Sequence, residues 1–221
     1  MKNKLLTALY CVCLVLFMLT FAIGLPIYCR FFYYIQIKTL GLEEATGWSY
    51  GVIKKAYDEV LNFCTLPWIK NFSAGELKFS ESGAAHFADC KVLFDLNFGV
   101  LVSSGAVLLT LIFLNRFKKI EILSFGKHKA YFWSGIIAVA LPVLLILIIA
   151  IAGFDRSFEA FHAIFFPGKE NWIFDYYEDE IIRVMPEEFF MNCAIIIAVG
   201  LIAFALALIS ADLIIKYKKR D

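Results

Sequence analysis

The chain has 221 residues, of which 61% are hydrophobic, and its formal net charge is only +1. Phenylalanine alone occurs 23 times. A composition this apolar excludes an ordinary soluble domain. We therefore predict an integral membrane protein, for which lipid is the solvent of much of the surface.

Four apolar stretches have the length of membrane-spanning helices. They run from about residue 5 to 28, 93 to 113, 130 to 153 and 189 to 213. Each is close to the ~20 residues that cross a hydrocarbon core of ~30 Å as a helix. We expect an all-α integral membrane fold of one domain, residues 1–221, in which four transmembrane helices are joined by two long helical loops, about 29–92 and 154–188.

The basic residues lie mostly on one side of this arrangement. Eleven of the 21 flank the N-terminus, the segment 115–129 and the C-terminus, whereas the opposite side carries ten basic and 17 acidic residues. The eleven are Lys2, Lys4, Arg116, Lys118, Lys119, Lys127, Lys129, Lys216, Lys218, Lys219 and Arg220. By the positive-inside rule both termini are cytoplasmic and both long loops face outward. The spans hold almost no ionisable groups, which argues against an ion or proton pathway.

The first long loop begins with an aromatic segment and continues with an amphipathic one. Arg30 to Tyr34 reads Arg-Phe-Phe-Tyr-Tyr, a composition typical of the membrane interface. Farther on, apolar residues recur at helical spacing, which predicts a helix that lies on the membrane or covers a site. They are Val52, Ile53, Ala56, Tyr57, Val60, Leu61 and Cys64.

A histidine and a carboxylate precede the second span. The segment 78–93 predicts a helix that continues into the span, with Ser82 as its N-cap. His86 and Asp89 are then one turn apart on one face. The carboxylate could hold the imidazole in one tautomer and stabilise its cation, as in a catalytic triad. The alternative is an exposed helix-end pair with little energetic effect.

A second histidine lies in the other outer loop. Phe158, Phe161, His162 and Phe165 share one face of a predicted helix that Pro167 and Gly168 terminate. Such a histidine is either a packed side chain or a catalytic imidazole in an apolar pocket that receives lipid. His86, Cys90 and His162 could also ligate a metal, although structural sites usually have four ligands.

The sequence resembles the bacterial lipoprotein intramolecular transacylase family, whose members have four spans and two long outer loops. The resemblance covers the whole chain. Its first motif is residues 81–91, and its second is Phe-His-x-x-Phe-Phe from Phe161 to Phe166, followed by Trp172, Asp179, Ile181, Pro186 and Phe189. It implies transfer of the sn-2 acyl chain of a diacylglyceryl group to the α-amine of the lipoprotein's N-terminal cysteine. Donor and acceptor share one molecule, so no cofactor is implied.

The resemblance assigns the family's two functional histidines to His86 and His162. We expect one to act as the base and the other to donate to the oxyanion or leaving oxygen, and Asp89 favours His86 as the base. Trp172 is then a supporting residue. Phe161, Phe165 and Phe166 would contact acyl chains, and Arg30 and Arg156 would contact carbonyl or oxyanion groups, unless these arginines are interfacial anchors.

The expected partners are diacylglyceryl-modified lipoproteins and membrane lipid, without nucleic acid. We expect a monomer in the bacterial cell membrane with its site on the extracytoplasmic side. Two alternatives have to be separated from this function. One is a non-enzymatic tetraspan scaffold that binds another membrane protein, and the other is an acyl hydrolase or transferase that acts on free phospholipids.

Overall fold

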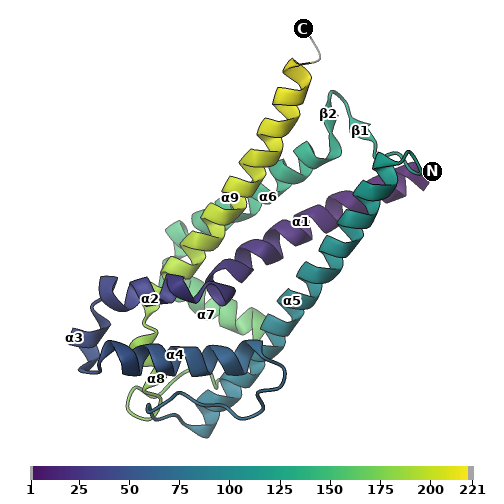
Figure 1. Ribbon diagram of the computed structural model, residues 1–221. Coiled ribbons are helices and arrows are strands. Elements are labelled where there is room, and N and C mark those ends of the chain that lie inside the picture. The colour runs from purple at the N-terminus through teal and green to yellow at the C-terminus, as the bar shows by residue number, and fades with distance from the viewer. Residues whose placement is uncertain (1, 219–221) are drawn as a thin grey trace. The chain divides into compact units, whose positions relative to one another are not determined.

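The computed structural model describes residues 2–218, which form a mostly helical protein (Figure 1). The elements in chain order are α1 (Lys2–Tyr28), α2 (Arg30–Thr39), α3 (Leu42–Thr46), α4 (Tyr50–Thr65), α5 (Glu81–Arg116), β1 (Ser124–Phe125), β2 (His128–Lys129), α6 (Ala130–Ala152), α7 (Phe154–Phe165), α8 (Ile181–Val184) and α9 (Glu187–Tyr217).

The four predicted spans are confirmed as apolar helices long enough to cross a membrane. They lie within α1, α5, α6 and α9. At 36 residues, α5 is about 54 Å long, well beyond a ~30 Å hydrocarbon core, so that part of it extends outside. Its apolar stretch begins near Leu93, which leaves the first turns of α5 for other roles. The membrane orientation stays a prediction, and Lys219 and Arg220, on which it partly rests, lie outside the described residues.

The prediction of a purely α-helical fold was incomplete. The segment between α5 and α6 contains a two-stranded antiparallel pair, in which Phe125 faces His128. Gly126, with a φ of 61°, supplies the left-handed conformation that the tight turn requires. Strands of two residues have no apolar periodicity, so the sequence pattern could not indicate them.

The described chain divides into two compact units. Unit 1 comprises residues 1–25, 97–148 and 196–221, and unit 2 comprises residues 26–96 and 149–195. The core of unit 1 is aliphatic and small, with Met18, Ala138 and Ala205 fully buried. Its polar groups pair locally: Thr20 Oγ1 donates to the Leu16 carbonyl at 2.8 Å, as threonines in apolar helices commonly do.

Unit 2 has an aromatic core to which the amphipathic helix α4 contributes its predicted apolar face. The Tyr33 ring of α2 stacks on Tyr57 of α4 with the centroids 3.7 Å apart. The Tyr33 hydroxyl donates to the Val184 carbonyl of α8, so that residues 151 positions apart are held together. This packing confirms the predicted helix and gives α4 a structural role within unit 2.

Candidate active site

The first turn of α5 is fixed by a buried carboxylate from the second loop. Asp179 accepts hydrogen bonds from the Ser80 backbone N–H at 2.8 Å and the Ser80 hydroxyl at 3.0 Å. Ser80 Oγ in turn accepts from the Gly83 N–H at 2.9 Å, so Ser80 is the N-cap and the prediction of Ser82 was wrong. A Cβ on Gly83 would lie 2.3 Å from Asp179 Oδ1. Glycine is therefore required where the second loop crosses the helix.

His86 follows one turn later and is only 5% exposed. Its ring packs edge-on against Phe166 and Phe174, with centroids 4.9 Å and 5.5 Å away. Its Nε2 atom lies 3.4 Å from Cys90 Sγ. Its Nδ1 atom is buried and has no hydrogen-bond partner among the described residues. Buried polar atoms are rarely left unpaired, because desolvation without a partner costs ~1–3 kcal/mol.

His162 lies on α7 and is 6% exposed. Its Nδ1 lies 2.8 Å from the Phe158 carbonyl oxygen. Because a carbonyl only accepts, Nδ1 carries the hydrogen, and the lone pair of the neutral ring is on Nε2. Burial lowers the pKa of His162 below the ordinary histidine value, and the hydrogen bond to Phe158 offsets this only in part. The imidazole is therefore kept neutral, as a proton acceptor must be.

The two histidines from separate loops meet inside unit 2. Their ring centroids are 5.7 Å apart, and the Phe166 ring contacts both. Trp172 stacks on His162 with the centroids 4.5 Å apart and the planes at 25°. The predicted pairing of His86 with His162, and the position of Trp172 beside them, therefore agree with the structure.

Asp89 contacts neither histidine directly. Its carboxylate accepts from Lys169 Nζ and, at 3.0 Å, from Asn171 Nδ2. These residues follow Gly168, whose φ of 72° turns the chain after α7. The expectation that Asp89 hydrogen-bonds His86 is corrected: the loop after α7 supplies nearer donors, and Asp89 connects that loop to α5.

The aromatic residues of α7 divide into two groups. Phe166 is buried against both imidazoles, whereas Phe161 and Phe165 are 47% and 49% exposed and contact each other with centroids 4.6 Å apart. Only the exposed pair has free surface on which to meet an acyl chain. Phe161 also touches the edge of His162, so this apolar surface is continuous with the histidine site.

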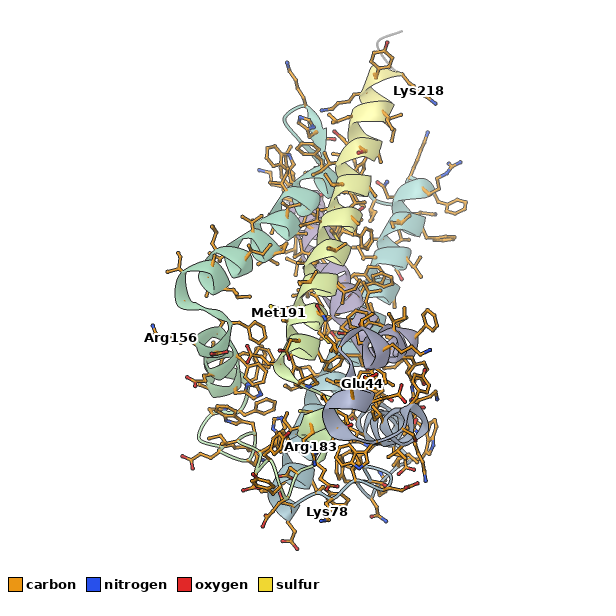
Figure 2. The ribbon with its side chains drawn as sticks, turned by 90° about the vertical axis from the view of Figure 1, so that its left-hand side faces the viewer. Glu44, Lys78, Arg156, Arg183, Met191 and Lys218 are labelled. Atoms are coloured by element: carbon orange, nitrogen blue, oxygen red, sulfur yellow. The ribbon has the colours of Figure 1, made fainter. Side chains whose placement is uncertain are left out.

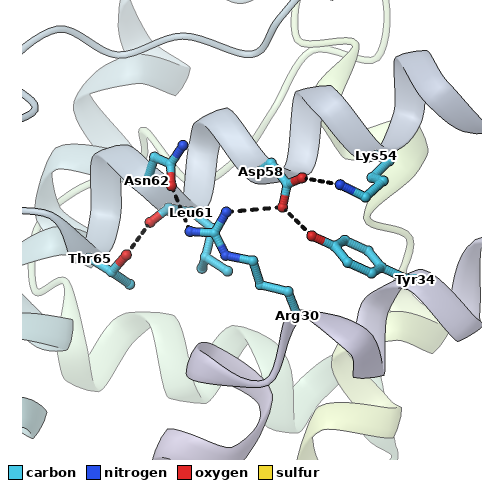
Figure 3. Close-up of polar contacts among 7 residues, drawn as sticks. All are labelled: Arg30, Tyr34, Lys54, Asp58, Leu61, Asn62 and Thr65. Carbon is cyan, nitrogen blue, oxygen red and sulfur yellow. Dashed lines mark hydrogen bonds and ion pairs between the residues drawn. The ribbon is translucent and has the colours of Figure 1, made fainter.

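The two predicted arginine contacts have other surroundings. Arg30 donates to Asp58 Oδ1 at 3.0 Å and to Asn62 Oδ1 at 2.6 Å, which ties α2 to α4 (Figure 3). Arg156 lies on the exposed side of α7 (Figure 2). No contact of either arginine with His86 or His162 occurs within residues 2–218. The geometry thus favours a structural role for Arg30.

The sequence gave no indication of several residues that line the site. Phe174 and Asn171 come from the segment after α7, which has no periodic pattern from which proximity could be inferred. The metal alternative finds no support, because residues 2–218 hold no group of three histidine, cysteine or carboxylate side chains that could bind an ion.

The buried histidine pair and the four apolar helices can be compared with known proteins. The model of the lipoprotein intramolecular transacylase Lit family matches residues 8–190. The chain belongs to this family. It is therefore a membrane acyltransferase that forms lyso-form lipoproteins.

Solved structures agree with the family assignment. The membrane integral transacylase Lit from Bacillus cereus is 25% identical and superposes with a TM-score of 0.88, covering 99% of this chain and 98% of its own. A histidine-to-alanine variant of that protein gives a TM-score of 0.82 over 99% of this chain and 96% of its own. A histidine-to-arginine variant gives 0.81 over 99% and 94%. A search of curated proteins found no match.

Proposed function

We propose that His86 and His162 form the catalytic centre of the transacylase. The observation that carries this proposal is the meeting of two buried imidazoles, from loops 76 positions apart in sequence, in an aromatic pocket. Each imidazole has a ring nitrogen for which no hydrogen-bond partner occurs within residues 2–218, Nδ1 of His86 and Nε2 of His162. That two of the solved Bacillus cereus structures are histidine variants is further support.

His162 is the better base of the two. Its hydrogen bond to the Phe158 carbonyl leaves the Nε2 lone pair available, and its depressed pKa keeps the ring neutral. The α-amine of the lipoprotein cysteine attacks the sn-2 ester carbon, and Nε2 takes its proton. The carbon–nitrogen bond forms, the carbon–oxygen ester bond breaks, and His162 returns the proton to the leaving glyceryl oxygen. Protons balance without a cofactor.

His86 is assigned to the developing oxyanion. The Cys90 thiol, 3.4 Å from Nε2, acts as a donor to it, so that Nδ1 carries the hydrogen. A buried Nδ1–H without a protein partner is a donor for the charge that forms on the ester oxygen. The roles of the histidines are therefore the reverse of those that Asp89 had suggested. Because amine and ester belong to one substrate, alignment supplies much of the remaining acceleration.

The location of the site follows from the same reading of the chain. We assign both termini to the cytoplasm and the histidine pair to the extracytoplasmic side, as the distribution of basic residues favours. The exposed Phe161 and Phe165 would receive the acyl chain next to His162. One chain supplies both histidines, so a monomer suffices for the reaction.

The test follows the acyl chain itself. Purified enzyme is given a diacylglyceryl lipopeptide with an isotope-labelled sn-2 chain, and the products are identified by mass spectrometry. The label should appear on the α-amine with the wild type and with His128→Ala, a histidine variant outside the site. It should stay on the glyceryl group with His86→Ala and His162→Ala. Transfer by either variant at the wild-type rate contradicts the assignment, and labelled free fatty acid identifies a hydrolase.

A further inference from the structure

Two polar atoms next to the catalytic pair are buried without hydrogen bonds. One is His86 Nδ1 and the other is Asn171 Oδ1. The two side chains interact with each other, but the atoms do not meet hydrogen-bond geometry. A donor and an acceptor that each lack a partner in the described chain form a complementary pair, and desolvation makes this arrangement unfavourable unless a ligand binds both.

The orientation of the Asn171 amide is determined by its neighbour. Its Nδ2 donates to Asp89 Oδ2 at 3.0 Å. A carboxylate only accepts here, so the amide oxygen has to point the other way. Lys169 holds the same carboxylate from its other oxygen. The chain from Lys169 through Asp89 to Asn171 therefore presents Oδ1 as a fixed acceptor beside His86.

We propose that Asn171 binds the reacting α-amine of the lipoprotein. This inference rests on the proposed function. The substrate presents an ester oxygen that becomes negative and an amine that carries hydrogens, which match the His86 donor and the Asn171 acceptor. With one amine hydrogen on Asn171 Oδ1 and another directed at His162 Nε2, the nitrogen lone pair is free to attack the ester carbon. Asn171 thereby selects a free amine and orients it.

The experiment measures amine recognition apart from turnover. Two non-reactive analogues are used, lipopeptides with an ether at the sn-2 position, one with a free α-amine and one with an acetylated α-amine. Their dissociation constants are measured for the purified wild type, Asn171→Ala and Asn62→Ala. Asn62 is a matched control, an asparagine of unit 2 that accepts from Arg30.

The wild type and Asn62→Ala should prefer the free amine by about tenfold, as expected for a buried hydrogen bond. Asn171→Ala should bind both analogues equally. A variant that is merely misfolded weakens both analogues alike, and unchanged preference in folded Asn171→Ala overturns the proposal. If Asn171→Ala does not fold, Asp89→Asn replaces it. This variant removes the carboxylate that fixes the amide, so it should reduce the preference by a smaller factor, and an undiminished preference also overturns the proposal.

The outcome is separate from that of the proposed function. Acyl transfer by the wild type is measured with the ester substrate in the same preparations. Transfer by the wild type together with unchanged amine preference in Asn171→Ala rejects only the role of Asn171. Absence of transfer in folded wild type rejects the function, whichever analogue binds better.

Discussion

The two units treat their buried polar groups differently. In unit 1, Asn97 donates to the Thr20 carbonyl at 3.2 Å, and Asp212 accepts from the Lys129 N–H at 3.0 Å and pairs with Lys216. All three buried side-chain polar atoms that lack a partner within residues 2–218 belong to unit 2, on His86, Asn171 and Arg183. Unit 1 is internally satisfied, as an apolar membrane part has to be. Unit 2 holds unmet hydrogen-bonding capacity in the part of the chain that carries the chemistry.

The strongest challenge to this comparison is a pair of core truncations. Phe166→Ala in unit 2 and Met18→Ala in unit 1 each remove a buried side chain, and each should lower the free energy of unfolding by roughly 2–5 kcal/mol. Phe166→Ala should also slow transfer by about 100-fold per folded molecule, because it releases both imidazoles. Thermal unfolding in detergent and rates normalised to folded protein provide the measurement. Similar rate losses in both variants would remove the distinction between the units.

A smaller effect is expected where the second loop caps α5. Asp179→Ala removes the acceptor for the Ser80 N–H and hydroxyl and should lower stability by about 1–2 kcal/mol. Transfer should fall as well, since His86 lies within two turns of that cap. Glu180→Ala is the control, because Glu180 accepts only at an exposed Lys78 N–H. Denaturant unfolding compares the two, and an equal change in both argues against Asp179 as the cap that matters.

The pH profile tests the environment of His162. Its pKa is lowered by burial, so the neutral base should persist below the ordinary value of ~6.5, and activity should be lost only as the pH falls farther. Trp172→Ala uncovers the stacked face of the imidazole and should move the acidic limb of kcat/KM upward. The measurement is the rate against pH for both proteins. A limb that stays in place would show that His162 is not the titrating base.

The smallest effect is expected for Arg30, which the sequence had suggested as a substrate contact. Asp58 receives donors from Arg30, Tyr34 and Lys54 (Figure 3). Burial alone would raise the pKa of Asp58, but these donors lower it overall. Arg30→Gln should lower stability by about 1 kcal/mol, since the arginine is partly exposed, and should leave kcat unchanged. A large decrease in kcat with unchanged stability would restore Arg30 to the site.

The sequence predicted local features better than long-range contacts. Apolar length indicated the four spans, and helical spacing indicated the buried face of α4, because both depend on neighbours within a few turns. The partner of Asp89 could not be found this way. Residues one turn apart on a helix need not pair when a loop 80 positions away supplies Lys169. The cap at Ser80 depends in the same manner on Asp179, 99 positions later.

The central claim is that the two histidines of unit 2 act as one unit in a single transfer. The most direct measurement is the rate of acyl transfer by His86→Ala, His162→Ala and the double variant, with His128→Ala as the control. Each single variant should lose about 10²- to 10⁴-fold, and the double variant should be little slower than the worse single one, because removing one member disables the pair. Losses that multiply in the double variant would contradict the claim, since they would mean that the histidines act independently.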